Sequence, residues 1–499
     1  MQHPELLSLP LDCASLRAAE QRAFEAGVDP AALMEFAAAG VVAVIRQFFP
    51  EPGRAVVFAG KGNNGGDALV VARLLAEAGW RTGIELAAQP DDLADLPRRM
   101  LERARAAGAT GAHPKGPLIA VDGLLGNGAE GPLRGAVLEA ARHLRALREE
   151  HGAQVIAIDL PSGVDADTGT VHPGAVRADI TVTLGLVKPG LLADESTDFV
   201  GRLALVPLPQ IEKWLPPTSV SEERVMLPAA FPGWLRRRAF DFHKGQAGRV
   251  TLWAGGPGCA GAARLCSAAA VRAGAGLVTL RAPEAMLEML ATACIPEVMV
   301  RSGETGWSKW NPSDAMGMGP GMGRDADHAI QGVVKDYPGI LVIDADALNA
   351  IAGNLELLKD AAGVRILTPH PGEMERLFPR ENRTRREWAR AFAASHPNVV
   401  ILLKGARTII TMGDGPIYFN TTGSPGMATG GMGDVLTGVI TALCARGIDP
   451  LHAAALGAWL CGRAAESALC QGESEESLAA SDVISHLGSA FSAWMGIGF

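Results

Sequence analysis

The chain has 499 residues, of which 48% are hydrophobic and 20% are charged. This length exceeds what one hydrophobic core supports, so two or three soluble globular domains are expected. A formal net charge of −9 argues against a broad surface for nucleic acid or membrane. The seven cysteines form no C-x-x-C pair, which argues against a zinc site or disulfide framework and fits a reducing cytoplasm. No signal peptide is expected, and the longest uncharged stretch, residues 415–433, is too rich in Gly, Thr and Ser to be a membrane span.

Short apolar segments alternate with amphipathic helices along the whole chain. The strands predicted in the first half are residues 55–59, 118–121 and 155–158, with helices at 68–78 and 133–149. The strands predicted in the second half are residues 250–253, 340–343, 364–367 and 399–403. Uninterrupted apolar runs are typical of parallel strands buried on both faces, so the alternation predicts two α/β domains.

A proline-rich segment separates the two halves. Six prolines fall between residues 207 and 232, and a charged patch lies at 222–224. We therefore predict an N-terminal domain at residues 1–215, a linker at 216–232 and a C-terminal domain at 233–499.

The first predicted strand runs into a glycine-rich turn, Gly60-Lys-Gly-Asn-Asn-Gly-Gly-Asp67, followed by a helix. Such a turn exposes backbone N–H groups at the positive end of a helix dipole, which suits phosphate. The letters also satisfy G-x-G-x-x-G, so a dinucleotide-binding redox fold is an alternative. Asn63, Asn64 and Asp67 inside the turn argue against it, as does the lack of a clear acidic residue ending the next strand.

Two carboxylates follow the next predicted strands, Asp122 and Asp159, and Ser162 comes soon after the second. In open α/β sheets, ligands bind beyond the carboxyl ends of the strands. Together with Asn64, these side chains are expected to meet at one rim of the sheet. The alternative is that both aspartates only cap the loops that follow them.

The glycine-rich turn and the segment Asp159-Leu-Pro-Ser-Gly-Val-Asp-Ala-Asp-Thr-Gly169 resemble the NAD(P)HX epimerase family. The resemblance implies a Rossmann-like three-layer α/β/α sandwich. It also implies that Asn64, Asp122 and Ser162 bind a potassium ion, for which oxygen-only ligands are suitable. Asp159 is the candidate group for proton transfer at C6 of the nicotinamide ring. The residues implied to hold the hydrated nucleotide are Asn63, Asn64, Gly65, Gly66, Asp67, Gly126, Asn127, Gly128, Ala129, Glu130, Gly131, Pro132 and Asp159.

Two features depart from the family pattern. Ala68 stands where the family usually has glycine, and a positive φ there would strain it. The segment 126–132 also differs from the usual Gly-Thr-Gly-Leu pattern.

The strongest motif of the second half is Gly423-Ser-Pro-Gly-Met-Ala-Thr-Gly-Gly-Met-Gly-Asp-Val-Leu-Thr-Gly438. Apolar spacing predicts a helix that starts near Asp434, with Gly430–Gly433 as a loop whose N–H groups can stabilise a transferring phosphoryl group. Asp434 is then placed to accept a proton from an attacking hydroxyl. The alternative is that Asp434 is an ordinary helix N-cap.

Five further motifs mostly follow predicted strands: His243–Val250, Met318–Gly323, Asp344–Asn349, Leu367–Met374 and Leu403–Thr408. From about residue 243 to 445 the chain resembles the ADP/ATP-dependent NAD(P)HX dehydratase family, which implies a ribokinase-like fold. The resemblance implies that the adenine nucleotide is bound by Lys404, Gly405, Ala406, Arg407, Thr408 and Gly433, and that the hydrate faces Ala262, Gly321, His370 and Asp434. The alternatives are that Lys404 is a solvated strand end and that His370 satisfies a loop carbonyl.

The two resemblances together imply repair of hydrated NADH and NADPH. The first half would interconvert the R and S hydrates, and the second would dehydrate the S form through a phosphorylated intermediate. Potassium, magnesium and ADP or ATP are the implied cofactors and co-substrate, in a cytoplasmic homo-oligomer without nucleic-acid or membrane partners. The alternatives are a ribokinase-like small-molecule kinase, and an N-terminal module that binds without turnover, as related domains do in RNA-decapping scaffolds.

Overall fold

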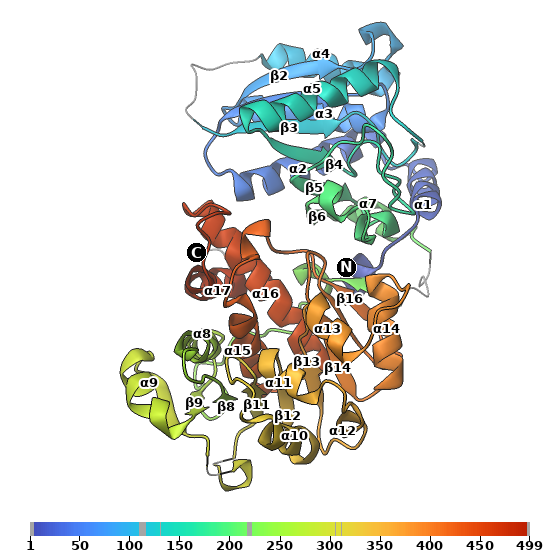
Figure 1. Ribbon diagram of the computed structural model, residues 1–499. Coiled ribbons are helices and arrows are strands. Elements are labelled where there is room, and N and C mark those ends of the chain that lie inside the picture. The colour runs from blue at the N-terminus through green and yellow to red at the C-terminus, as the bar shows by residue number, and fades with distance from the viewer. Residues whose placement is uncertain are drawn as a thin grey trace. The chain divides into compact units, whose positions relative to one another are not determined.

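The computed structural model describes residues 4–108, 116–129, 131–216, 222–304, 306–310 and 312–496. The chain forms two compact units, Met1–Ser221 and Glu222–Phe499 (Figure 1). Strand β7 (Glu223–Val225) pairs with β16 (Ile417–Phe419) and so belongs to the sheet of the second unit. The linker predicted at 216–232 is therefore too long, because its part from Glu222 onward is built into the second unit.

The N-terminal unit is a six-stranded parallel sheet with the order β2-β1-β3-β4-β5-β6. The strands are β1 (Arg54–Ala59), β2 (Arg81–Leu86), β3 (Leu118–Gly123), β4 (Gln154–Ile158), β5 (Ile180–Leu184) and β6 (Arg202–Val206). Its helices are α1 (Cys13–Glu25), α2 (Pro30–Phe48), α3 (Asn63–Glu77), α4 (Asp95–Ala107), α5 (Gly135–His151), α6 (Thr197–Val200) and α7 (Pro209–Glu212). All three strands predicted for this half are confirmed.

The sheet is buried on both faces, as the apolar runs predicted. On one face, Phe58, Ala120 and Val155 form a core with Leu144 of α5. On the other face, Ala68 of α3 lies so close to Gly123 that a side chain at residue 123 would overlap it. Figure 1 shows α5 and α3 running along the strands of this unit. The carboxyl ends of the strands consequently open at one edge, between the two helical layers.

Within the described residues, α2 is the one helix with the length and apolar composition of a membrane span. Its buried side chains include Leu33, Ala37, Val41 and Ile45, spaced by four residues. This spacing places them on one stripe of the helix, which is buried within the N-terminal unit.

The C-terminal unit contains a ten-stranded sheet with the order β10-β9-β8-β11-β12-β13-β14-β15-β16-β7. The strands besides β7 and β16 are β8 (Arg249–Trp253), β9 (Leu277–Ala282), β10 (Val298–Ser302), β11 (Ala315–Met318), β12 (Ile340–Ile343), β13 (Arg365–Leu367), β14 (Val399–Leu403) and β15 (Ile409–Met412). Strands β8 to β14 are mutually parallel, and β15 runs antiparallel to both its neighbours. The four strands predicted for this half are confirmed.

Helices cover this sheet, and two of them are buried on all sides over most of their length. They are α8 (Ala260–Arg272), α9 (Leu287–Ala293), α10 (Asp327–Asp336), α11 (Ala345–Ile351), α12 (Glu356–Lys359), α13 (Pro371–Leu377), α14 (Arg385–Ser395), α15 (Met432–Ala445), α16 (Pro450–Cys470) and α17 (Ala480–Met495). Every residue of α15 from Val435 to Ala445 is buried, as a helix that is apolar all round requires. Only its first turn reaches the surface, and there it carries Asp434.

Candidate active sites

The glycine-rich turn of the N-terminal unit is shorter than the sequence predicted, because helix α3 begins within it. Helix α3 begins at Asn63, so Asn63–Asp67 form its first turn rather than a loop. A Cβ atom on Gly65 would lie 2.0 Å from the carbonyl oxygen of Gly60, so the close approach requires glycine. Ala68 lies inside the helix and has no positive φ, which means that its departure from the family pattern causes no backbone strain.

The three predicted potassium ligands are brought together by hydrogen bonds. Asp122 is fully buried, and its carboxylate accepts from Ser162 Oγ at 2.7 Å and from Ser162 N at 2.8 Å. Leu125 N donates to Ser162 Oγ at 3.0 Å, and Asn64 Nδ2 donates to the carbonyl of Leu125 at 2.8 Å. Asp122 also accepts from Leu124 N at 3.1 Å. It therefore caps the loop that follows it, as the alternative predicted, in addition to binding Ser162. Burial raises the pKa of Asp122, although its bonds to Ser162 and Leu124 oppose the shift.

Asp159 is held differently. It follows β4 with a φ of 68°, a left-handed conformation that is uncommon outside glycine. Its Oδ1 forms an ion pair with Lys188 Nζ and accepts from Thr183 Oγ1 at 3.3 Å and Leu184 N at 3.1 Å. These partners lie on or after β5, so the alternative that Asp159 merely caps its own loop is wrong.

Sequence reasoning missed Lys188 entirely. The only signal for it was a single charge inside the otherwise uncharged stretch 180–193.

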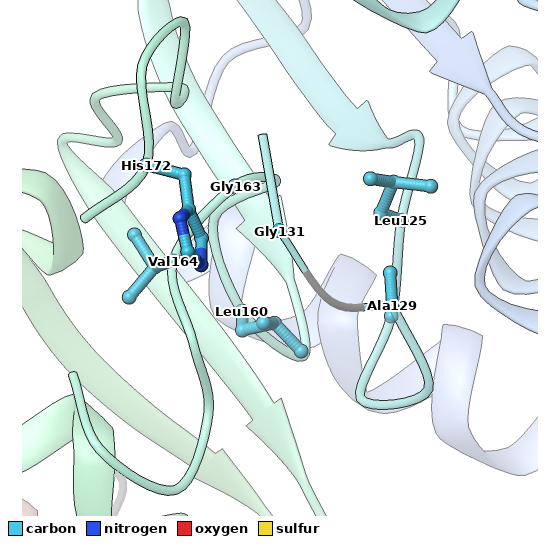
Figure 2. A pocket seen from close by; sticks show the side chains of 8 residues that line it. Leu125, Ala129, Gly131, Leu160, Gly163, Val164 and His172 are labelled. Atoms are coloured by element: carbon cyan, nitrogen blue, oxygen red, sulfur yellow. The ribbon is translucent and has the colours of Figure 1, made fainter. Parts of the chain in front are cut away.

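A pocket opens beside this rim (Figure 2). It is lined by Leu125, Gly126, Ala129, Gly131, Leu160, Gly163, Val164 and His172. The predicted substrate segment therefore contributes to it, whereas Glu130 lies outside the described residues. Figure 2 places the ring of His172, a residue that the sequence analysis did not single out, across from Leu125 and Ala129. Arg17 of α1 donates to the carbonyl of Asn127 at 2.6 Å and so ties α1 to the same segment.

Two further carboxyl groups lie near Asp159. Burial raises the pKa of Asp67 well above its ordinary range, and the charges of Asp159 and Glu20 add to the shift. Burial also raises the pKa of Glu20 on α1, again with a contribution from Asp159. Besides Asp122, the site therefore contains one ion-paired carboxylate and two carboxyl groups that hold protons more strongly than usual.

In the C-terminal unit, helix α15 begins at Met432, so Gly430 and Gly431 precede it, whereas Gly433, predicted to be part of the loop, lies in its first turn. Gly431, with a φ of 93°, caps α15, and Asp434 lies in the first turn. The alternative that Asp434 is the N-cap is therefore wrong. Burial raises the pKa of Asp434 to about 6, and the nearby Asp344 adds to the shift while Lys404 opposes it. A carboxylate of this kind accepts protons close to neutral pH.

Lys404 is not a solvated strand end. Its ammonium donates to Asp344 Oδ1 at 2.9 Å and lies 3.6 Å from Glu373 Oε2. Burial works against its charge, but Asp344 and Glu373 outweigh that effect and raise the pKa of Lys404. Asp344 is 1% exposed and also accepts from Thr437 Oγ1 at 3.1 Å. The sequence indicated a motif at Asp344–Asn349 but no role for Asp344 itself.

His370 has a structural task as well as an exposed face. Its Nδ1 accepts from Gly372 N at 3.0 Å and from Glu373 N at 3.4 Å, so it caps α13. The alternative that His370 satisfies a loop carbonyl is therefore wrong, because its ring nitrogen accepts from backbone N–H groups. Since Nδ1 accepts, the ring proton is assigned to Nε2. The side chain is 53% exposed, and its Nε2 lies 3.6 Å from Glu373 Oε1.

The remaining predicted residues surround the start of α15. A Cβ atom on Gly433 would lie 3.1 Å from Asp344 Oδ2 and 3.4 Å from Lys404 Nζ. Gly321 has a φ of 61°, and a Cβ atom there would lie 3.1 Å from that of Ala262 on α8. Helix α8 also contacts the loop before α15, since a Cβ atom on Gly431 would lie 2.6 Å from Leu265 Cδ1.

The segment 404–408 connects the antiparallel strands β14 and β15. Thr408 Oγ1 closes it by donating to the carbonyl of Gly405 at 3.0 Å, and Arg407 is 3% exposed. Gly405 and Ala406 are exposed. Within this predicted set, Lys404 bonds to the carboxylates beside Asp434, and residues 405–406 are exposed to solvent.

Comparisons with known proteins match both units to known families. A family described as NAD(P)H-hydrate dehydratase matches residues 250–487, and one described as YjeF-related protein N-terminus matches residues 30–190. The bifunctional NAD(P)H-hydrate repair enzyme Nnr of Moorella thermoacetica is 37% identical over 492 residues, with 91% of each chain covered. The Gloeobacter violaceus protein of the same name is 36% identical over 481 residues, with 90% of this chain and 93% of the relative covered.

One solved structure is the ADP/ATP-dependent NAD(P)H-hydrate dehydratase of Bacillus subtilis, co-crystallised with ATP and Mg²⁺. It is 29% identical, covers 54% of this chain and 97% of its own, and has a TM-score of 0.48. The fold and sites define a two-domain α/β enzyme with a Rossmann-like and a ribokinase-like unit, as predicted. On the identity and coverage of its relatives, the chain belongs to the family of bifunctional NAD(P)H-hydrate repair enzymes.

Proposed function

We propose that the chain repairs hydrated NADH and NADPH with one activity in each unit. The N-terminal unit interconverts the R and S hydrates at C6 of the nicotinamide ring. The C-terminal unit dehydrates the S hydrate at the expense of ADP or ATP. The observation that carries this proposal is Asp434, a carboxylate with a pKa of about 6, at a glycine-rich helix start beside the Asp344–Lys404 pair.

The dehydration needs activation because hydroxide is a poor leaving group. The C6 oxygen attacks the terminal phosphorus of the nucleotide, the bridging P–O bond breaks, and Asp434 takes the hydroxyl proton. Phosphate then leaves with the C6–O electron pair as the N1 lone pair forms a C=N bond. Loss of a proton from C5 restores the ring double bond. The N–H groups of Gly430–Gly433 stabilise the transferring phosphoryl group.

We assign the substrate and the nucleotide to two sets of residues around the start of α15. We assign Ala262, Gly321, His370 and Asp434 to the hydrate, and Lys404–Thr408 with Gly433 to the adenine nucleotide. Magnesium, when bound, neutralises phosphate charge. The described residues contain no group of three or more His, Cys, Asp or Glu side chains arranged for a metal ion. We therefore assign most of the magnesium ligands to phosphate oxygens of the nucleotide. Glu373, beside Lys404, is the candidate ligand from the protein.

Inversion at C6 requires the hydroxyl to leave one face of the ring and water to add to the other. We assign proton transfer in these steps to Asp159, and substrate binding to residues 63–67 and 126–132. A potassium ion at Asn64, Asp122 and Ser162 fits the structure, because the hydrogen bonds to fully buried Asp122 from described residues come from neutral donors. The ion supplies a positive charge that offsets Asp122 beside the phosphates of the substrate.

The test is to incubate the purified chain with both hydrate epimers, with and without nucleotide. We expect interconversion alone without nucleotide, and complete return of both epimers to NADH or NADPH with it. Accumulation of a stable phosphorylated product would instead favour a small-molecule kinase. Persistence of the R hydrate would favour an N-terminal binding module. A cytoplasmic location and a homo-oligomer are further proposals, to be tested by cell fractionation and light scattering.

A further inference from the structure

The N-terminal unit contains a lysine whose side chain is completely buried. Lys188 is 0% exposed, and its Nζ donates to Thr183 Oγ1 at 3.0 Å, to the carbonyl of Leu184 at 2.9 Å and to Asp159 Oδ1. An ammonium group has three N–H donors, so these three acceptors satisfy it completely. A charge is retained in such a position only when it is paired and hydrogen-bonded. Lys188 therefore has no donor left for a substrate and acts on the site only through its partners.

The consequence for Asp159 is that its two oxygens differ. Oδ1 accepts from Lys188 Nζ, Thr183 Oγ1 and Leu184 N. No described residue donates a hydrogen bond to Oδ2, although the side chain is 9% exposed. The left-handed backbone of Asp159 requires stabilisation by its surroundings, and the three bonds to Oδ1 provide it. One oxygen is thus anchored, and the other is left for chemistry.

We propose that Lys188 is a positioning residue of the epimerase site: it holds Asp159 as a carboxylate, with Oδ1 fixed and Oδ2 ready to accept a proton. This inference rests on the proposed epimerase function and names a residue through which Asp159 performs it. Carboxyl groups in contrasting environments commonly divide acid and base roles between them. Here the ion-paired Asp159 is the base, and the acid is Asp67, because it lies in the first turn of α3 within the segment 63–67 that we assign to the substrate.

Epimerisation at C6 then requires two proton transfers. Asp67 gives its proton to the C6 hydroxyl, the C6–O bond breaks, water departs with the electron pair, and N1 forms a C=N bond. Water then adds to the opposite face of C6, the π electrons return to N1, and the released proton passes to Oδ2 of Asp159. Reaction in the other direction uses the same two groups with their roles exchanged, so one site serves both epimers.

The groups that face this pair support the division of roles. Asp67 on α3 and Glu20 on α1 both have raised pKa values, mainly because of burial. The Cys13 thiol on α1 stays neutral, since burial raises its pKa to about 12. Lys188 is the cation that bonds to Asp159 in the described part of the chain. Without it, Asp159 would be a carboxylate among other carboxyl groups, which favours protonation and loss of the base.

The experiment compares Lys188→Met and Lys188→Arg with the wild type in the whole chain. Interconversion of the hydrates is measured without nucleotide across the neutral pH range. For Lys188→Met we expect kcat to fall about 100-fold or more, KM to change much less, and the acidic limb of the pH profile to move to higher pH. Lys188→Arg keeps a cation and should recover part of kcat. Dehydration of the S hydrate should stay at the wild-type level in both variants.

Arg148→Met is the matched control. Arg148 pairs with Asp179 at 2.7 Å, before β5 and at the opposite edge of the sheet, so its loss removes an ion pair without touching the site. Wild-type kcat and pH profile in Lys188→Met, or a loss of kcat that matches Arg148→Met with an unmoved profile, would overturn the proposal.

If Lys188→Met does not fold, Thr183→Val replaces it, because it removes one contact from both Lys188 and Asp159. An unchanged kcat and pH profile in Thr183→Val would also overturn the inference. A wild-type chain that fails to interconvert the epimers refutes the epimerase function itself, which is a separate result.

Discussion

Replacing Asp434 by asparagine should lower the rate of dehydration and, at the same time, raise the stability of the fold. Asparagine keeps the shape of the side chain but cannot take a proton, so dehydration should fall roughly 100- to 10,000-fold. Epimerisation takes place in the other unit and should be unchanged. In the wild type, dehydration should also decline as pH drops below about 6, because Asp434 then binds the proton that it must accept from substrate.

The same substitution should stabilise the fold near neutral pH. Burial raises the pKa of Asp434 from 3.8 to about 6, which corresponds to at most about 3 kcal/mol of destabilisation when the group is ionised. Because the folded-state pKa is the raised one, this cost is fully present above about 6 and vanishes below about 4. Asparagine removes the cost. At neutral pH the variant should therefore unfold at a higher denaturant concentration than the wild type, whereas in acid the two should unfold at the same concentration.

The assay is denaturant unfolding of the whole chain at several pH values, alongside nucleotide-dependent dehydration. Near-normal dehydration by Asp434→Asn would remove Asp434 from the mechanism. A stability difference between variant and wild type that does not depend on pH would refute the burial argument, even if activity were lost.

Other predictions concern the cation site, the boundary and the departure from the family pattern. Asp122→Ala should weaken epimerisation and abolish its potassium dependence, and equal rates for variant and wild type at every potassium concentration would refute the cation site. A C-terminal fragment starting at Ser221 should be soluble and dehydrate the S hydrate, whereas one starting at Gly233 lacks β7, exposes the edge of β16 and should melt at a lower temperature. Ala68→Gly should lower the free energy of unfolding by roughly 1 kcal/mol without changing epimerisation, because residue 68 is already helical; a large change in rate would contradict the observed backbone.

The parts of this protein that are encoded locally were predictable. The strands at 55–59, 340–343 and 399–403 are short apolar runs, and burial on both faces of a parallel sheet is sufficient to specify them. The start of α15 near Asp434 was likewise visible in the apolar spacing after a glycine-rich loop. By contrast, β7 is a three-residue strand with two charged side chains, and it becomes a strand only because β16 offers an unpaired edge.

The charge pairs of the two sites depended on the folded arrangement. Asp159 and Lys188 are 29 residues apart, and Asp344 and Lys404 are 60 residues apart. Apolar periodicity reports which face of an element is buried, but it does not report which buried charges meet. Asp159 and Asp434 were recognisable from their motifs. Their environments are opposite: Asp159 is ion-paired, whereas Asp434 is desolvated beside a second carboxylate. In each unit this environment arises where separate strands end at one edge of that unit's sheet. Only there do side chains that are distant in sequence share a region of low dielectric constant.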